Sequence, residues 1–196
     1  MAMIRLLFIF SILTFFYSGR AHSQLITNAS QAPNQLVQNI LIGNGVTVSN
    51  IQYTGANQAI GYFNGVNSNI GLNEGIIITT GTVLGNSTGP VGPNNSVSAG
   101  TDNGAGSFGL LQNTLGGVQT YNAAILEFDF VPTSDTLQFR FVFASEEYPE
   151  YVCSDYNDVF AFYISGQNPQ GGTYNNQNLA LIPGSTIPVA INNVNI

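Results

Sequence analysis

The sequence predicts an all-β protein, an antiparallel β-sandwich or jelly-roll-like fold with one short N-terminal helix. Two stretches, residues 124–130 and 137–143, alternate apolar and polar side chains, which is typical of strands with one face on a core. Other short β-rich runs are separated by Asn, Gly and Pro, as they are in sandwiches. The long polar segment 85–107 has the composition of a loop and carries no sign of a linker between two cores.

The first 23 residues have the layout of a secretory signal peptide. Arg5 supplies a positive start, residues 6–17 form an apolar run, and Ala21-His22-Ser23 places small residues before a cleavage site. The apolar run is shorter than the roughly 20 residues that a membrane-spanning helix needs, which disfavours an uncleaved anchor. We therefore expect a signal peptide over 1–23 and one β domain over 24–196.

The elements of that domain follow from local patterns. Residues 31–41 form the one helical candidate, with Ser30 as N-cap, Pro33 in the first turn and Gly43 after the end. Residues 159–164 are apolar on both faces and predict a central strand. The remaining strand predictions are 46–48, 51–53, 59–63, 76–80, 178–182 and 188–191.

Composition excludes several classes of function. Once residues 1–23 are removed, Arg140 is the only basic side chain against ten acidic ones, a formal charge of −9 (1 − 10). Such a chain repels phosphate backbones and anionic headgroups, so we expect neither nucleic acid nor an anionic membrane surface as a partner. Without His or Lys, it also lacks a Ser-His-Asp triad, His-ligated zinc and Schiff-base chemistry.

Half of the carboxylates are crowded into one stretch, residues 146–158, which we call the acidic turn. Clustered carboxylates and amides on a loop are ligands that Ca²⁺ prefers, although the spacing matches no EF-hand. The alternative is a turn that satisfies itself, since Asp and Asn are also good turn and cap residues. Both interpretations stay open, and the candidate Ca²⁺ ligands are Glu146, Glu147, Asp155, Asn157 and Asp158.

Other carboxylates allow further hypotheses. Glu127 and Asp129 share the face opposite Leu126, where they are expected either to face solvent beside Arg140 or, less simply, to add metal ligands. A pair such as Glu147 and Asp155 would be needed for a glycoside hydrolase, but a sequence does not give their separation.

Cys153 is the only cysteine, an odd count for an exported protein. It is predicted to be a free buried thiol or to pair with a cysteine on another segment or chain. The sequence stops directly after a predicted strand, so we expect these residues to be the front part of a longer domain.

Several ordered motifs resemble the choice-of-anchor L domain family. The most specific are FRFVFASEEYPEYV at 139–152 and NDVFAFYISG at 157–166, preceded by LEFDFVP at 126–132. Further similar stretches are NQLVQNILIGNGVTVSNIQYTG at 34–55, GIIITTG at 75–81, LALIPG at 179–184 and PVAINNVN at 188–195. The resemblance thus covers essentially all of residues 25–196.

The resemblance implies a bacterial surface or secreted protein, as found in many Bacteroidota, some with type IX secretion or gliding-motility signals. It implies no defined activity. Relatives continue past the end of this chain, which supports the expectation of a fragment and leaves room for a partner of Cys153. They also tend to carry Asp where this chain has Asn122, and an acid within the region that GAGSFGLL occupies, so metal binding through those positions would be weaker here.

Three hypotheses for function follow. The first is a non-catalytic module of the cell surface that binds an extracellular glycan or surface protein, with the acidic turn organised by Ca²⁺. The second is a secreted, carboxylate-dependent polysaccharide hydrolase. The third is a structural spacer of a large surface protein, which would bind no ligand.

Overall fold

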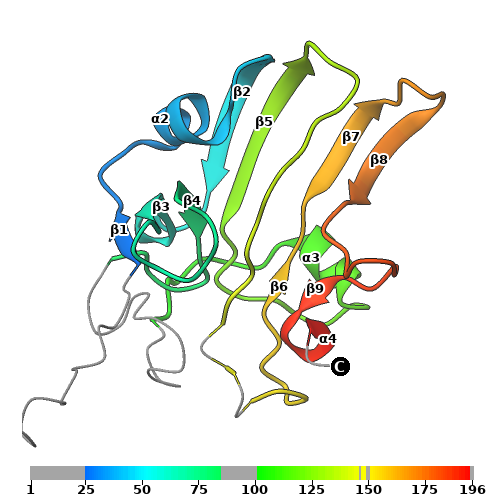
Figure 1. Cartoon of the computed structure of the whole chain (residues 1–196). Coiled ribbons are helices and arrows are strands. Elements are labelled where there is room, and N and C mark those ends of the chain that lie inside the picture. Colours follow the sequence, from blue (N-terminus) through cyan, green and yellow to red (C-terminus); the bar gives the residue numbers. More distant parts are fainter. Residues whose placement is uncertain (1–24, 85–100, 146, 149–150, 195–196) are drawn as a thin grey trace, which may run out of the picture.

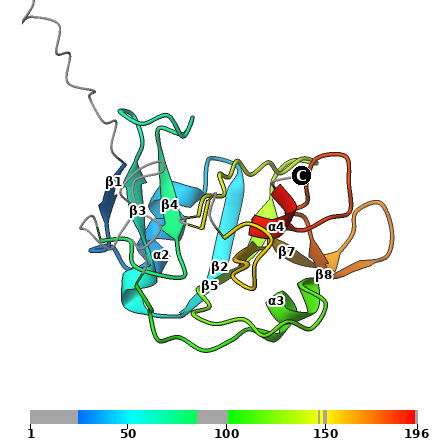
Figure 2. The ribbon, with the colours of Figure 1, turned by 90° about the horizontal axis from the view of Figure 1, so that it is seen from below.

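Antiparallel strand pairs make up most of the regular structure, which confirms the predicted all-β class. The computed structural model describes residues 25–84, 101–145, 147–148 and 151–194, so the predicted signal peptide and most of the polar loop lie outside the described residues. Figure 1 shows a small sheet beside a row of longer strands, and Figure 2 shows the same arrangement from below.

The small sheet has the order β1-β3-β4, from β1 (Ile26–Asn28), β3 (Ile60–Asn64) and β4 (Glu74–Ile78). A 3₁₀ turn, η2 (Asn57–Ala59), leads into β3. Ile60 pairs with Ile78 and Phe63 with Gly75, where a ring approaches so closely that a Cβ on Gly75 would lie 2.8 Å from it. Glycine at position 75 therefore lets the Phe63 ring lie directly against β4.

The predicted N-terminal helix is present as α2 (Pro33–Leu36), continued by a π-turn, η1 (Val37–Leu41). Its N-cap is Ala32 and not the predicted Ser30, because the Gln35 side chain reaches back and accepts a bond from the Ala32 amide at 3.1 Å. Leu36 and Val37 are fully buried, and α2 packs against both β2 and β3. The helix thus joins the small sheet to the longer strands.

The runs 46–48 and 51–53, predicted as two strands, form one nine-residue strand, β2 (Val46–Thr54), which pairs with β5 (Ile125–Pro132). The pairing register shifts between Ser49 and Gln52, where Asn50 adopts a positive φ of 52°. Asn tolerates this conformation better than most residues, so the strand bulges there and continues. The Asn50 amide then donates to the Asp129 carboxylate at 2.6 Å.

In the second half of the chain, the paired strands are shorter than predicted. The central strand 159–164 is divided into β6 (Val159–Phe160) and β7 (Tyr163–Gln167), which pair with β9 (Val189–Ala190) and β8 (Thr173–Asn178) respectively. The predicted strand 178–182 is wrong. Asn178 ends β8, and its Oδ1 accepts from the Phe162 and Ala180 amides, which bends the chain.

The predicted strand 137–143 is also wrong in its backbone pairing. These residues belong to no strand in the described structure, although Figure 1 shows them running between β5 and β7. Rings still meet across the gap, with Phe139 4.5 Å from Phe162 and Phe141 5.0 Å from Phe160. The preceding turn is held toward β2 instead, because the Thr133 amide and hydroxyl both bond the Gly45 carbonyl. The alternation of apolar and polar residues in 137–143 therefore predicted which side chains share a face. It did not predict which strand, if any, pairs with their backbone.

Two short helices were not predicted, α3 (Gly109–Thr114) and α4 (Ile191–Val194). Tyr163 of β7 fixes α3, since its hydroxyl contacts that of Thr114 and donates to the Leu110 carbonyl at 2.9 Å. Ile191 at the start of α4 is fully buried. Both helices lie in the half of the molecule that contains strands β6 to β9 (Figure 1).

Tyr53 on β2 should make the stability of the fold depend on pH in the alkaline range. Burial raises the pKa of its phenol from 10 to about 12, and its hydroxyl donates to the Ala56 carbonyl at 2.8 Å. Because the unfolded phenol ionises first, the free energy of unfolding should fall as pH rises from about 10 to about 12. Urea unfolding across that window should show this fall. Tyr53→Phe should make the curve flatter, leaving the smaller dependence due to Tyr62, whose pKa is raised by its bond to Glu74. An unchanged slope in Tyr53→Phe would contradict the assignment.

Candidate functional site

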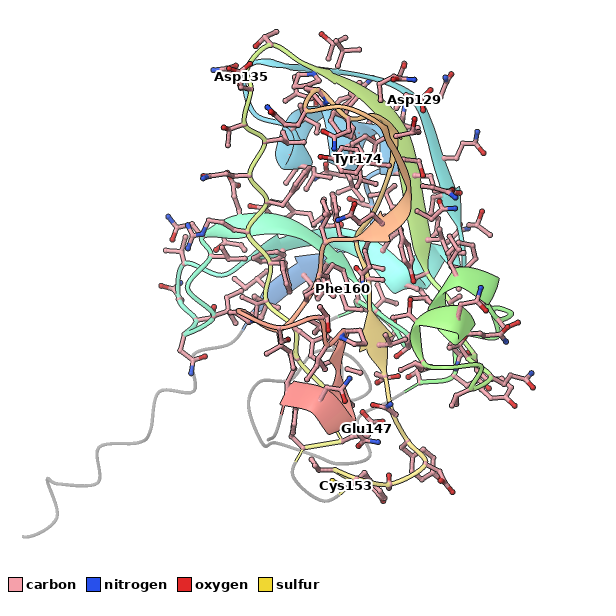
Figure 3. All side chains as sticks on the ribbon, turned by 90° about the vertical axis from the view of Figure 1, so that its right-hand side faces the viewer. Asp129, Asp135, Glu147, Cys153, Phe160 and Tyr174 are labelled. Atoms are coloured by element: carbon pink, nitrogen blue, oxygen red, sulfur yellow. The ribbon has the colours of Figure 1, made fainter. Side chains whose placement is uncertain are left out.

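The acidic turn leaves the extended segment 137–145 and returns the chain into β6. Residues 147–148 and 151–158 of it are described, whereas Glu146 and Glu150 lie outside the described residues. Figure 3 labels Glu147 and Cys153 at the same end of the molecule, well away from Asp129 and Asp135.

Short-range bonds order the first part of the turn. The Glu147 carboxylate accepts from the Ser145 hydroxyl, and the same hydroxyl accepts from the Glu147 amide at 3.2 Å. Further along, the Tyr151 amide donates to the Glu147 carbonyl and the Ser154 amide to the Tyr151 carbonyl. This predicted metal ligand therefore already has a polar partner, in the residue directly before the turn.

Asn192 of α4 holds the second part of the turn. Its Oδ1 accepts from the Cys153 amide at 2.6 Å, and its Nδ2 donates to the Ser154 carbonyl at 3.1 Å. Its own amide donates to Oδ1 of Asn157 at 3.0 Å. Cys153 has a positive φ of 65°, an unfavourable conformation for this residue, and the bond to Asn192 helps to hold it there. We call these contacts the amide clamp.

The amide clamp includes one predicted metal ligand, Asn157, and one residue that the sequence did not single out, Asn192. Asn157 was predicted to bind a metal, and here its amide oxygen accepts from the amide at the start of α4. The neighbouring Asp158 carbonyl likewise accepts from the Ile191 amide at 3.0 Å. Asn192 was missed because it lies 35 residues from Asn157 in sequence, and no local pattern connects the two.

The predicted carboxylates are not all brought together. Asp155 is exposed, Asp158 is half-buried, and no group of three His, Cys, Asp or Glu side chains converges within the described part of the chain. Because Glu146 and Glu150 lie outside that part, the Ca²⁺ hypothesis stays a prediction.

Glu127 and Asp129 lie on the exposed face of β5, as one alternative predicted, but without Arg140 as an ion-pair partner. Asp129 accepts from Asn50, and the Arg140 guanidinium donates to the Gly71 carbonyl at 3.0 Å. The predicted cross-strand contact fails because residues 137–143 do not pair with β5.

Two tyrosines add an aromatic surface to the turn. The rings of Tyr151 and Tyr156 lie 5.3 Å apart at 71°, an edge-to-face pair, and are 38% and 64% exposed. The Tyr156 amide is fixed by the Ser154 hydroxyl at 3.1 Å. Cys153, between them in sequence, is exposed, which contradicts the predicted burial; its pairing with a cysteine on another segment or chain stays a prediction. The turn thus presents two aromatic rings and the Asp155 carboxylate on the surface.

If the amide clamp orders the turn, its removal should loosen the turn first. Asn192→Ala removes two bonds from a half-buried site, and we expect it to cost about 1–3 kcal/mol of stability. Hydrogen exchange of the Cys153 amide should become faster. Asn193→Ala is the matched control, because the Asn193 side chain donates to the Pro188 carbonyl and, among the described residues, makes no bond to the turn. Equal exchange of the Cys153 amide in both variants would contradict the role of the clamp.

Comparison with known proteins gives one match. The choice-of-anchor L domain matches residues 25–196, nearly the whole chain. No curated protein and no solved structure matches it. Among the described residues, no helix is both long and apolar enough to cross a membrane. A domain of this description is a module of the cell surface, and the chain belongs to the choice-of-anchor L domain family.

Proposed function

We propose that this cell-surface module is a non-catalytic binding domain and that the acidic turn is the part that contacts an extracellular glycan. The observation that carries this proposal is the exposed Tyr151–Tyr156 pair, with Asp155 and Asn157 adjoining Tyr156 in sequence. Tyrosine is enriched at interfaces, because its ring is apolar and its hydroxyl can hydrogen-bond, so two exposed tyrosine rings in contact favour a binding role.

The chemistry of the turn fits a sugar. An aromatic ring offers an apolar face with a polar hydroxyl, which suits the mixed C–H and O–H surface of a pyranose. The exposed Asp155 carboxylate would accept bonds from sugar hydroxyls, and bonds to a charged acceptor are the stronger kind. The edge-to-face angle of 71° directs the two ring faces differently, so they can contact two sides of one ligand.

The negative charge of the acidic turn limits which glycans can bind there. The acidic turn carries five carboxylates, and residues 24–196 contain Arg140 as their only basic side chain. Sulfated or carboxylated sugars would be repelled, whereas neutral or amino sugars would not. We therefore favour a neutral or amino-sugar polymer as the ligand.

A Ca²⁺ ion is part of the proposal as an organiser of the turn. Its donors would be Glu146, Glu147, Asp155 and Asp158, with the amide oxygen of Asn157. Asn157 already accepts one bond from Asn192, but a carbonyl oxygen has a second lone pair. The cation would neutralise crowded carboxylates and fix the turn for its partner.

Tyr156→Ala should weaken glycan binding about tenfold, because an anchor ring of this kind contributes about 1.4 kcal/mol or more. Tyr121→Ala is the matched control, since Tyr121 is similarly exposed at 68% and lies outside the acidic turn. Binding to neutral and amino-sugar polymers should be measured by calorimetry after a glycan array. Equal affinity of the two variants would overturn the site, and binding of no glycan by the unaltered protein would favour the spacer hypothesis.

Thermal unfolding in Ca²⁺ and in EDTA tests the cation separately. A ligand at a hundred times its dissociation constant stabilises a protein by about 2.7 kcal/mol, a rise of several degrees for a domain of this size. Asp155→Asn or Asp158→Asn should abolish the rise, and Asp135→Asn, outside the turn, should not. An identical melting temperature in both buffers would remove Ca²⁺ from the proposal and leave the glycan site standing.

A further inference from the structure

The sequence contains three Asn-Gly pairs, at 44–45, 64–65 and 103–104, and the structure gives each a different environment. An Asn-Gly pair can modify itself, because the backbone nitrogen of the glycine can attack the side-chain amide carbon of the asparagine. Glycine has no Cβ to hinder that approach. The attack needs a glycine amide that is free and an asparagine side chain that can turn toward it. The hydrogen bonds of each pair therefore indicate whether it can react.

The pair at 64–65 is protected by the small sheet. Asn64 is the last residue of β3 and lies opposite Glu74 of β4. Its Oδ1 accepts from the Val66 amide at 3.1 Å. Gly65 is buried, and its amide donates to the Asn73 carbonyl at 2.8 Å. Both groups that would have to meet are therefore already bonded.

The pair at 103–104 is protected by Asn122. The half-buried Asn103 side chain is held at both ends, since its Nδ2 donates to the Asn122 carbonyl at 3.0 Å and its Oδ1 accepts from the Ala105 amide at 2.7 Å. The Gly104 amide donates to the Asp102 carboxylate at 2.8 Å and to Oδ1 of Asn122 at 3.1 Å. This nitrogen is therefore not available for attack either.

The pair at 44–45 lies open in the turn before β2. Both residues are exposed, and neither the Asn44 side chain nor the Gly45 amide has a hydrogen-bond partner among the residues that the structure describes. Gly45 has a φ of 92°, a conformation that suits glycine. Its carbonyl, in contrast, is an anchor, because it accepts from the amide and the hydroxyl of Thr133, both at 2.9 Å.

We propose that Asn44 is a site of spontaneous deamidation, which loosens the end of the β2–β5 pair. The Gly45 nitrogen forms a bond to Cγ of Asn44, the bond from Cγ to the side-chain nitrogen breaks, and ammonia leaves with the proton of the Gly45 amide. Water then opens the resulting succinimide. Opening at Cγ gives aspartate, and opening at the backbone carbonyl gives isoaspartate. Water is the only co-reactant, and the site is independent of the proposed glycan site.

The product alters the chain directly beside an anchor of the fold. Isoaspartate routes the main chain through the side chain and so adds one methylene before Gly45, whose carbonyl then moves relative to Thr133. Val46 and Pro132, which end the β2–β5 register, adjoin these two residues. The new carboxylate also adds negative charge, and the one basic side chain of residues 24–196, Arg140, already donates to the Gly71 carbonyl.

Ageing the purified protein in mildly alkaline buffer tests the site. Pepsin digestion at low pH, followed by mass spectrometry, distinguishes the amide from the acid at each asparagine. Asn44 should convert about tenfold faster than Asn64 or Asn103, or more, because the protected pairs must first open locally. In urea the three rates should become similar. No conversion of Asn44, equal rates in the folded protein, or the same order of rates in urea would overturn the proposal.

A variant tests the consequence for the fold. Asn44→Gln keeps the side-chain amide but would have to close a larger ring, so it should not convert on the same timescale. Isoaspartate in the aged protein can be measured by methyl transfer from S-adenosylmethionine with an isoaspartate-specific methyltransferase. Hydrogen exchange of the Thr133 amide should be faster in the aged protein than in the fresh one, and unchanged in aged Asn44→Gln. Unchanged exchange in protein that carries isoaspartate would overturn the proposed loosening.

Discussion

The scarcity of positive charge constrains the whole structure. With Arg140 as the single basic side chain of residues 24–196, carboxylates cannot be neutralised by ion pairs. They take neutral donors instead: Asn50 for Asp129, Tyr62 for Glu74 and Ser145 for Glu147. The acidic turn is likewise held by a neutral side chain, the amide of Asn192, in place of a Lys or Arg. Neutral donors leave the negative charge in place, so salt, which screens the repulsion among the carboxylates, should stabilise the fold.

Period-2 alternation was enough to predict the fold class and the faces of the strands. In β5, Leu126, Phe128 and Phe130 are half-buried while Glu127 and Asp129 are exposed, as the pattern required. Alternation does not choose a backbone partner, and residues 137–143 show the difference, since their rings meet β6 and the residues after it without a ladder. The polar strand β8 was missed because Thr173–Asn178 carries no apolar alternation at all.

The candidate site was predictable in part. Local sequence located the acidic turn and named Asn157 as a candidate Ca²⁺ ligand, but it did not predict that Asn192 donates to Asn157. Asn192 is one of many asparagines, and only the packing of α4 against the turn distinguishes it. The aromatic pair escaped notice for a similar reason. Tyr151 and Tyr156 are five positions apart, a spacing that matches neither a strand nor a helix face, and the turn alone brings their rings together.

The position of Arg140 has a consequence for survival outside the cell. Trypsin-like proteases cut after Lys or Arg, and beyond residue 24 this chain offers them one such bond. That bond lies in an extended segment that belongs to no strand, the conformation such enzymes require of a substrate. Within residues 24–196, attack by such an enzyme is therefore limited to one exposed bond, in the segment between β5 and β7.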